Sequence, residues 1–411
     1  MKYINNFLLI CFILVITLSG CKTNYKETDS SYFKFRSAYS DYIEIYEFDK
    51  ENFNEEQLII PSKYEGKKVI YITEGVFDGL RSVKIIKIPK HLQKLEKNFN
   101  NCESLENVIL NKEIEGINYC FLNCPKLKEI KISNSVHEIR DSFNGCVSLK
   151  EIEIGNSVHE IRDSFNGCAS LKEIEFNNNI KRIGSSFKKC SSIEKITMPS
   201  SLELLSISFY DCLSLKVIEF SSFSKLKDIS AFNNCPLIEE VKLPNSIEYL
   251  YGFNGCVSLK EIEFPNNVKE ISGFYKCHSL IKITIPNSVQ KIAWAFEGCI
   301  NLETVYFESG SKVEMIMGFN DCEKLVEFTI PSNTKVLCNF MNNTSIKTIT
   351  IPKSIEKIDA RCFNECLDLE KVIFEEGSEL KVVNESCFKG CPKLGEVNYP
   401  NDVEIQPYPT F

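Results

Sequence analysis

Apolar residues recur along most of the chain in a repeating unit, F-x-x-C-x-x-L-x-x-I-x-I, whose copies are 21 to 25 residues apart. A phenylalanine opens each of fifteen units, and in thirteen of them a cysteine follows three residues later. Such regularity predicts a stack of structural repeats. The phenylalanines are Phe77, Phe99, Phe121, Phe143, Phe165, Phe187, Phe209, Phe232, Phe253, Phe274, Phe296, Phe319, Phe340, Phe363 and Phe388. The cysteines are Cys102, Cys124, Cys146, Cys168, Cys190, Cys212, Cys235, Cys256, Cys277, Cys299, Cys322, Cys366 and Cys391, while Leu80 and Asn343 fill the same position in the other two units.

The two halves of the unit have different periods, so they predict different elements. Spacings of three, as in Phe143, Cys146 and Leu149, place apolar side chains on one face of a tight helical turn. The alternation of Ile152 and Ile154 is instead typical of a strand. The residue before the cysteine is usually Gly, Asn or Asp, which tolerate positive φ and indicate where the helical turn stops. Each unit is therefore predicted to contain a short helical turn followed by one strand.

The connections between units complete the predicted architecture. Proline commonly follows the strand and turns the chain, and a second apolar pair, such as Val136 with Ile139, returns it to the next phenylalanine. Stacked units form parallel strands about 4.8 Å apart, so fifteen make a curved rod on the order of 70 Å long. We assign residues 77–399 to the repeats, residues 39–76 to a cap over the first coil, and residues 400–411 to a C-terminal tail.

The complete unit, with Pro-x-Ser-Val-x-x-Ile after the strand, resembles the BspA-like subfamily of leucine-rich repeats over residues 77–399. The resemblance implies an α/β repeat solenoid: a right-handed leucine-rich-repeat superhelix with a parallel β-sheet on its concave face and short helical turns on its convex face. It also implies display on a cell surface, where some members of the family bind host matrix proteins or other microbes. The unit at Asn343 departs from the pattern in the cysteine position, and the last units are longer than the rest.

The N-terminus has the features of a secretory signal for a lipoprotein. Lys2 precedes an uncharged, almost wholly apolar run over residues 7–18, which is too short to span a bilayer. The run ends in the tetrapeptide of residues 18–21, Leu-Ser-Gly-Cys, which matches a bacterial lipobox. We therefore expect a signal peptide over residues 1–20, a lipid on Cys21 and a flexible tether over residues 21–38. A plain signal peptide with a chance cysteine is the alternative. The lipid would anchor the protein to the cell envelope. We expect its location to be the outer membrane or the cell surface.

Composition and charge restrict the classes of ligand. The formal net charge is −8, whereas nucleic-acid binding requires a basic surface, so we expect no nucleic-acid partner. After Cys11 and Cys21 are set aside, 17 of the 19 cysteines remain. Complete pairing of an odd number is impossible, and a fixed inward position suits Cys as a small apolar residue, so we predict buried free thiols.

Four further cysteines lie just before the phenylalanine and form C-x-x-x-C pairs in some units. Two such pairs are in neighbouring coils and raise the alternative of a four-thiolate zinc site. Packing of small residues explains them more simply, so we expect no metal and no other cofactor. These four cysteines are Cys120, Cys338, Cys362 and Cys387.

Catalytic motifs are absent from the sequence, and we expect no enzymatic activity. His137 and His159 lie one unit apart, which raises the alternative of a metal site or a pH sensor. However, residues 134–153 and 156–175 are identical at 19 of 20 positions, so duplication of a unit also explains the paired histidines.

The outward positions of the predicted strands form the candidate binding surface. Its first half is acidic and its second half is neutral, with threonine and tyrosine, which are compatible with an interface. A merely solvated sheet is the alternative interpretation. We predict that this surface binds a protein or glycan ligand in adhesion to host or neighbouring cells; a structural scaffold of the cell envelope is the alternative function. The candidate residues are Glu129, Lys131, Glu151, Glu153, Glu173, Glu175, Thr284, Tyr306, Thr329 and Thr350.

Overall fold

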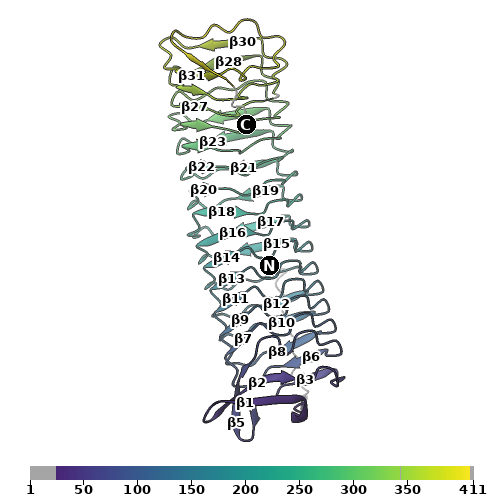
Figure 1. The fold of residues 1–411 in the computed structure, drawn as a ribbon. Coiled ribbons are helices and arrows are strands. Elements are labelled where there is room, and N and C mark those ends of the chain that lie inside the picture. Colours follow the sequence, from purple (N-terminus) through teal and green to yellow (C-terminus); the bar gives the residue numbers. More distant parts are fainter. Residues whose placement is uncertain (1–24, 343, 408–411) are drawn as a thin grey trace, which may run out of the picture.

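The structure, a computed structural model, describes residues 25–342 and 344–407. The chain winds into a rod of stacked coils, with a column of short strands on each of two sides (Figure 1). The predicted signal peptide, Cys21 and Asn343 lie outside the described residues. The parallel-strand solenoid predicted from the repeats is confirmed, but the elements within each coil differ from those expected.

One column of strands forms a continuous 15-stranded sheet, in which the neighbouring strands are parallel. Identical positions of successive units pair in register, as in Ile117, Ile139 and Ile161. The strands of this sheet lie in the segment after the proline, around the second apolar pair of each unit, such as Val136 with Ile139. The sequence predicted only a connection there, so most coils have two strands instead of one. Its strands are β7 (Lys94–Glu96), β9 (Gly116–Asn118), β11 (Glu138–Arg140), β13 (Glu160–Arg162), β14 (Arg182–Gly184), β16 (Leu204–Ser208), β18 (Asp228–Ala231), β20 (Tyr249–Leu250), β22 (Glu270–Ile271), β24 (Lys291–Ile292), β26 (Met315–Ile316), β27 (Val336–Leu337), β29 (Lys357–Ile358), β31 (Val382–Asn384) and β32 (Glu404–Gln406).

The strands predicted from the I-x-I alternation form the other column, which is interrupted. Here the strands join into one three-stranded and five two-stranded parallel sheets, which we call the segmented sheet. The three-stranded part contains β3 (Gln57–Ile59), β6 (Ile85–Lys87) and β8 (Asn107–Ile109). The pairs are β10 (Glu129–Lys131) with β12 (Glu151–Glu153), β15 (Lys195–Met198) with β17 (Val217–Phe220), β19 (Glu240–Lys242) with β21 (Glu261–Glu263), β23 (Lys282–Ile285) with β25 (Thr304–Phe307), and β28 (Thr348–Ile351) with β30 (Lys371–Phe374).

The first coil is covered by a small sheet in the order β1-β2-β5-β4, at the purple end of Figure 1. Its strands are β1 (Phe33–Tyr39), β2 (Tyr42–Phe48), β5 (Lys67–Ile72) and β4 (Lys63–Tyr64), preceded by the 3-10 helix η1 (Ser30–Tyr32). Phe33 and Phe48 pack against the first repeat phenylalanine, Phe77. The assignment of residues 33–38 to a tether is therefore corrected. These residues belong to β1, and their alternating apolar side chains pack into the cap.

The opposite end also extends beyond its predicted boundary. Residues 404–406 were assigned to the C-terminal tail, yet they form β32, which pairs with β31 through Ile405 opposite Val383. The backbone N–H of Glu404 additionally donates to the carbonyl of Lys381 at 2.9 Å. The continuous sheet therefore includes this part of the tail.

The predicted short helical turns are turns with left-handed residues. Within the described residues, η1 is the only helix. Phe99 has a φ of 64° and Asn101 a φ of 57°, and a right-handed helix cannot contain such a pair. The same positive φ recurs before the cysteine at Gly145 and Gly167, as the residue types there indicated. Spacings of three therefore bury one side of a sequence of tight turns.

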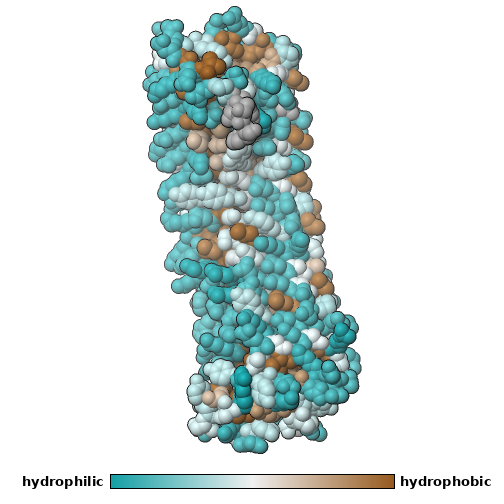
Figure 2. Space-filling model, viewed as in Figure 1, coloured by the Kyte–Doolittle hydropathy of each residue, from teal (hydrophilic) through white to brown (hydrophobic). Residues whose placement is uncertain are grey.

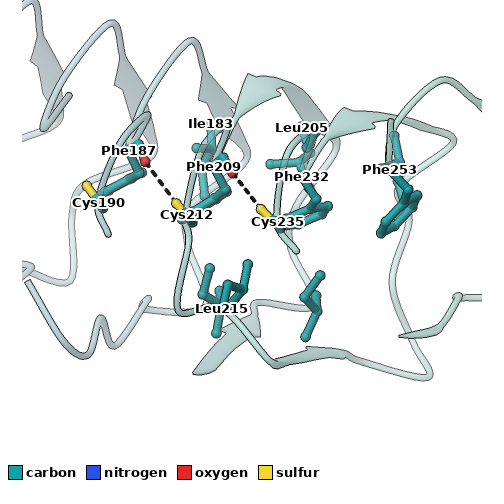
Figure 3. Packing of buried hydrophobic residues seen from close by; sticks show 14 of the residues in the cluster. Ile183, Phe187, Cys190, Leu205, Phe209, Cys212, Leu215, Phe232, Cys235 and Phe253 are labelled. Carbon is teal, nitrogen blue, oxygen red and sulfur yellow. Dashed lines mark hydrogen bonds between the residues drawn. The ribbon is translucent and has the colours of Figure 1, made fainter. Parts of the chain in front are cut away.

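The centre of the rod is a column of stacked phenylalanine rings. From Phe77 to Phe319, successive ring centroids are 5.0 to 5.8 Å apart and the rings are nearly parallel. Phe340, whose unit carries Asn343 in the cysteine position, instead lies edge-on to both of its neighbours. Figure 3 shows four rings of the column beside the cysteines. Because such rings bury a large apolar area, the column is a major source of the rod's stability.

Polar ladders connect the coils alongside this core. The buried hydroxyl of Ser164 accepts the backbone N–H of Ser142 at 3.1 Å, and that of Ser186 accepts the N–H of Ser164 at 3.1 Å. Asn144 and Asn166 form a comparable ladder, in which the side-chain oxygen of Asn144 accepts the N–H of Asn166 at 2.8 Å. These bonds satisfy buried backbone groups that the tight turns leave without strand partners.

Candidate binding faces

All ten residues of the predicted binding surface are exposed on the segmented sheet side. β10, β12, β23, β25 and β28 hold seven of them, and their outward side chains alternate with buried isoleucine or valine. Glu173 and Thr329 lie outside named strands, and Glu175 forms an isolated parallel bridge with Glu153. The alternation in the sequence therefore identified the exposed positions correctly.

Some of these residues are neighbours across paired strands. Glu129 lies opposite Glu151, and Thr284 lies opposite Tyr306. Lys131 forms an ion pair with Glu153 at 2.7 Å, so one acidic residue of this patch is neutralised by the preceding coil. Both side chains are largely solvent-exposed, so this pair contributes little to stability. The acidic half and the neutral half remain separate regions along the rod.

The neutral half contains a large exposed aromatic residue. The side chain of Tyr306 is 59% exposed, and Ile373, which lies opposite Thr350 across β28 and β30, is 37% exposed. Apolar and aromatic groups of this kind favour contacts with a partner. Figure 2 shows that one face of the rod is mostly hydrophilic and that its apolar residues form separate patches.

The outer face of the continuous sheet is a second candidate binding surface. It was not recognised in the sequence, because the strands of this sheet were not predicted. Its outward residues are charged near the cap, as at Glu160 and Arg162, whose side chains pair at 3.2 Å. Farther along, Tyr249 and Tyr251 stack with their ring centroids 6.3 Å apart. The residues flanking the isoleucine of each returning segment carried the only signal for this face.

Two depressions lie in the N-terminal third of the rod. The larger has a volume of about 470 Å³ and lies beside the ends of β3, β6 and β8, with an apolar floor that includes Ile60 and Leu110. Lys87 borders it and lies over the Tyr25 ring, 5.3 Å from its centroid. The smaller has a volume of about 280 Å³ and lies on the outer face of the continuous sheet, beside His137 and His159.

The 17 cysteines among the described residues are free thiols, and 15 of them are buried. Burial raises the pKa of the Cys190 thiol to about 12 and that of Cys168 well above its ordinary value, because the interior disfavours the thiolate. Residues 25–342 and 344–407 contain no group of three or more His, Cys, Asp or Glu placed to hold a metal ion. The same ranges contain no helix long and apolar enough to cross a bilayer.

Comparison with known proteins agrees with this architecture. The model of the BspA type leucine rich repeat region matches residues 41–164, 140–252, 228–339 and 311–411. The chain belongs to this family. A search of curated proteins gives no match.

Solved structures similar to this BspA-type chain are leucine-rich repeat proteins. A leucine-rich repeat protein from Bacteroides ovatus is 21% identical, with a TM-score of 0.64, and the alignment covers 94% of this chain and all of that one. A leucine rich cell surface protein from Faecalibacterium prausnitzii is 18% identical, with a TM-score of 0.45 and coverage of 91% and 95%. The likeness to the Bacteroides protein supports the fold.

Proposed function

We propose that this BspA-type protein is a lipid-anchored protein of the cell envelope whose solenoid binds protein or glycan ligands, in adhesion to host or neighbouring cells. The observation that carries the proposal is the long row of outward side chains on the segmented sheet, from Glu129 in β10 to Thr350 in β28. The family and its fold also support a role in binding.

The size of the surface favours a ligand that contacts several coils at once. One strand of the segmented sheet presents only two or three outward side chains, whereas a stable protein interface buries about 800 Å² on each partner. Contacts spread over several coils reach this area. We therefore expect the ligand to lie along the rod and to contact both the acidic half and the neutral half of this surface.

Membrane attachment is tested at Cys21, the lipidation site of the predicted lipobox. The full-length protein and the variant Cys21→Ala are expressed in a bacterial host and partitioned between detergent and aqueous phases. We expect the wild type in the detergent phase and the variant in the aqueous phase or as unprocessed precursor. Equal partition of both proteins into detergent would contradict lipid anchoring.

Ligand binding is tested with residues 22–411, the predicted mature protein without its lipidated Cys21, immobilised and exposed to purified matrix proteins, host-type glycans and surface proteins of the same cell. Saturable binding to a matrix protein or glycan supports adhesion. Binding only to the cell's own surface proteins supports the alternative, a structural scaffold of the envelope.

A further inference from the structure

The outer face of the cap sheet carries a group of exposed tyrosines at the end of the rod (Figure 1). The inner side of this sheet is buried, as at Ile43 and Ile45 of β2. The four tyrosines, from β1, β2 and β5, are between 37% and 67% exposed. Together with three basic residues they form a surface that we call the tyrosine face. Its residues are Arg36, Tyr39, Tyr42, Tyr46, Lys63, Lys68 and Tyr71.

The pairing of the strands places these residues side by side. One row crosses all four strands in register and contains Tyr39, Tyr42, Lys68 and Lys63. Beside this row, Tyr71 of β5 lies opposite Glu44 of β2. The guanidinium group of Arg36 lies over the ring of Tyr46, 5.5 Å from its centroid. The tyrosine face therefore interleaves aromatic rings with basic groups.

The cap sheet is basic although the chain is acidic. Its four strands contain five lysines or arginines and two glutamates, whereas the formal net charge of the whole chain is −8. Both glutamates are neutralised by β1. The carboxylate of Glu44 accepts a hydrogen bond from Arg36 at 2.8 Å, and that of Glu47 accepts one from Lys34 at 2.5 Å. An excess of positive charge therefore remains on the strands.

Two of the basic residues are placed where they repel each other. Lys63 of β4 lies directly opposite Lys68 of β5, and neither lysine forms an ion pair with a described residue. Like charges in this position destabilise a sheet. Asp41 and Glu65 lie in the turns that join the strands. An anionic partner on this face would relieve the repulsion.

The chain enters the rod at the same end. Thr28 is buried and fixed to β3, because its N–H donates to the carbonyl of Ile59 at 3.0 Å and its hydroxyl accepts the N–H of Ile59 at 2.9 Å. Three residues separate Cys21, the predicted lipidation site, from Tyr25, the first described residue. Even a fully extended chain spans at most about 14 Å from Cys21 to Tyr25. A lipid on Cys21 therefore holds the cap end of the rod close to the bilayer surface.

We propose that the tyrosine face rests on the headgroup layer of an anionic phospholipid bilayer, the one that holds the lipid on Cys21. Tyrosine favours this layer, because its ring is apolar and its hydroxyl group is polar. Lys63 and Lys68 attract the lipid phosphates. The rod then stands on its cap, and the segmented sheet extends away from the membrane. The inference rests on the proposed lipid anchor and adds a protein surface to it.

The test uses residues 22–411, which include every described residue, with a hexahistidine tag before residue 22. Nickel-chelating lipids in phosphatidylcholine vesicles hold the tag and take the place of the lipid on Cys21. Hydroxyl-radical footprinting, measured by mass spectrometry, reports the accessibility of each tyrosine in solution and on vesicles with and without phosphatidylglycerol. The tyrosines of the tyrosine face should lose most of their oxidation only where phosphatidylglycerol is present. Tyr306, which is 59% exposed on the segmented sheet, is the matched control and should react as it does in solution.

A charge variant connects this protection to the two lysines. The double variant Lys63→Gln/Lys68→Gln should lower the ratio of protected to unprotected tyrosine face by about 25-fold, about fivefold for each basic residue near an anionic surface. Lys282→Gln/Lys371→Gln is the matched control. It removes the same charge from two exposed strand residues of the segmented sheet and should leave the footprint unchanged.

Three outcomes overturn the proposal: the tyrosines react equally on the two kinds of vesicle, Tyr306 is protected to the same extent, or protection persists in Lys63→Gln/Lys68→Gln. Protection by a host-type glycan, with tyrosines that stay reactive on both kinds of vesicle, would identify the tyrosine face as a glycan site instead. Because the tag replaces the lipid, these results do not depend on lipidation of Cys21. Detergent partition of Cys21→Ala tests the proposed anchor separately.

Discussion

The thiol of Cys212 donates a hydrogen bond to the backbone carbonyl oxygen of Phe187, one coil earlier, at a distance of 3.3 Å (Figure 3). Both residues are fully buried, and Phe187 has a φ of 61°. The same bond joins Cys235 to Phe209 at 3.2 Å. The cysteine column thus has a second role besides filling space, because a small apolar side chain with a weak donor satisfies a carbonyl that the turn directs along the rod.

Removing this donor should destabilise the coil locally. Cys212→Ala leaves the Phe187 carbonyl buried without a donor, a change that costs about 1–3 kcal/mol. The free energy of unfolding from urea denaturation and amide hydrogen exchange near residues 187–212 measure the effect. Cys338→Ala, at a half-buried site outside the column, is the control. Equal stability of both variants would show that the thiol bond contributes nothing.

The phenylalanine column predicts a second local effect. Phe209→Ala removes a fully buried ring that stacks on Phe187 at 5.1 Å and on Phe232 at 5.6 Å. We expect a loss of about 3–5 kcal/mol. Because each coil contacts only its neighbours, hydrogen exchange should accelerate first over residues 187–232.

Phe223→Ala is the matched control for that experiment, because the Phe223 side chain is 83% exposed. It should change the stability by less than about 0.5 kcal/mol. A uniform increase in exchange along the whole rod in Phe209→Ala would contradict a stack of locally stabilised coils.

The repeat, the buried phenylalanine column and the exposed strand positions were predictable because each depends on the spacing of residues within one unit. The continuous sheet was not, since most of its strands contain one buried residue, such as Ile139, and a strand of two or three residues has too short an alternation to be recognised. Helical turns were predicted wrongly where residues such as Phe99 adopt positive φ, because a spacing of three does not distinguish a helix from successive tight turns.

The smaller depression on the continuous sheet could not be predicted for a different reason. Its lining includes Gly116, which lies between Lys94 and Glu138, and this neighbourhood appears only when the register of three coils is known. The paired histidines were visible in the sequence, but duplication of a unit explained them equally well. Comparison of residues within one unit cannot show a missing side chain in a row that runs along the rod.

Glu248 provides a test of the electrostatics between coils. Lys227 and Lys269, from the coils on either side, both donate to its carboxylate, and these bonds lower the pKa of Glu248 to about 2. A carboxyl whose pKa is lower in the folded state stabilises the fold above its unfolded pKa, and this contribution disappears as the pH falls through the folded value.

We therefore expect Glu248→Gln to be less stable than the wild type at pH 6 and the difference to fade between about pH 4.5 and pH 2. Urea denaturation over this pH range at low and high salt measures it. The difference should also shrink at high salt, because the ammonium groups of Lys227 and Lys269 are exposed and salt screens their attraction to the carboxylate. A difference that is independent of both pH and salt would indicate a packing effect instead of the two ion pairs.

The adhesive face is tested by two sets of substitutions, because a ligand that contacts several coils is weakly affected by a single change. Reversing Glu151, Glu153, Glu173 and Glu175 to Lys inverts the acidic half, whereas replacing Tyr306, Thr329 and Thr350 by Asp introduces charge into the neutral half. All seven side chains are exposed, so both variants should fold like the wild type. Circular dichroism and thermal unfolding check this requirement before binding is measured.

The two sets distinguish where a confirmed ligand lies on the rod. A basic ligand should lose at least tenfold in affinity, and most of its salt dependence, with the first set, since the attraction comes from the glutamates. A neutral ligand should lose affinity with the second set, because its contacts would leave the introduced carboxylates desolvated and unpaired. Unchanged affinity in both folded variants would exclude the outer face of the segmented sheet as the binding surface and direct the search to the continuous sheet, where Tyr249 and Tyr251 provide the next aromatic pair.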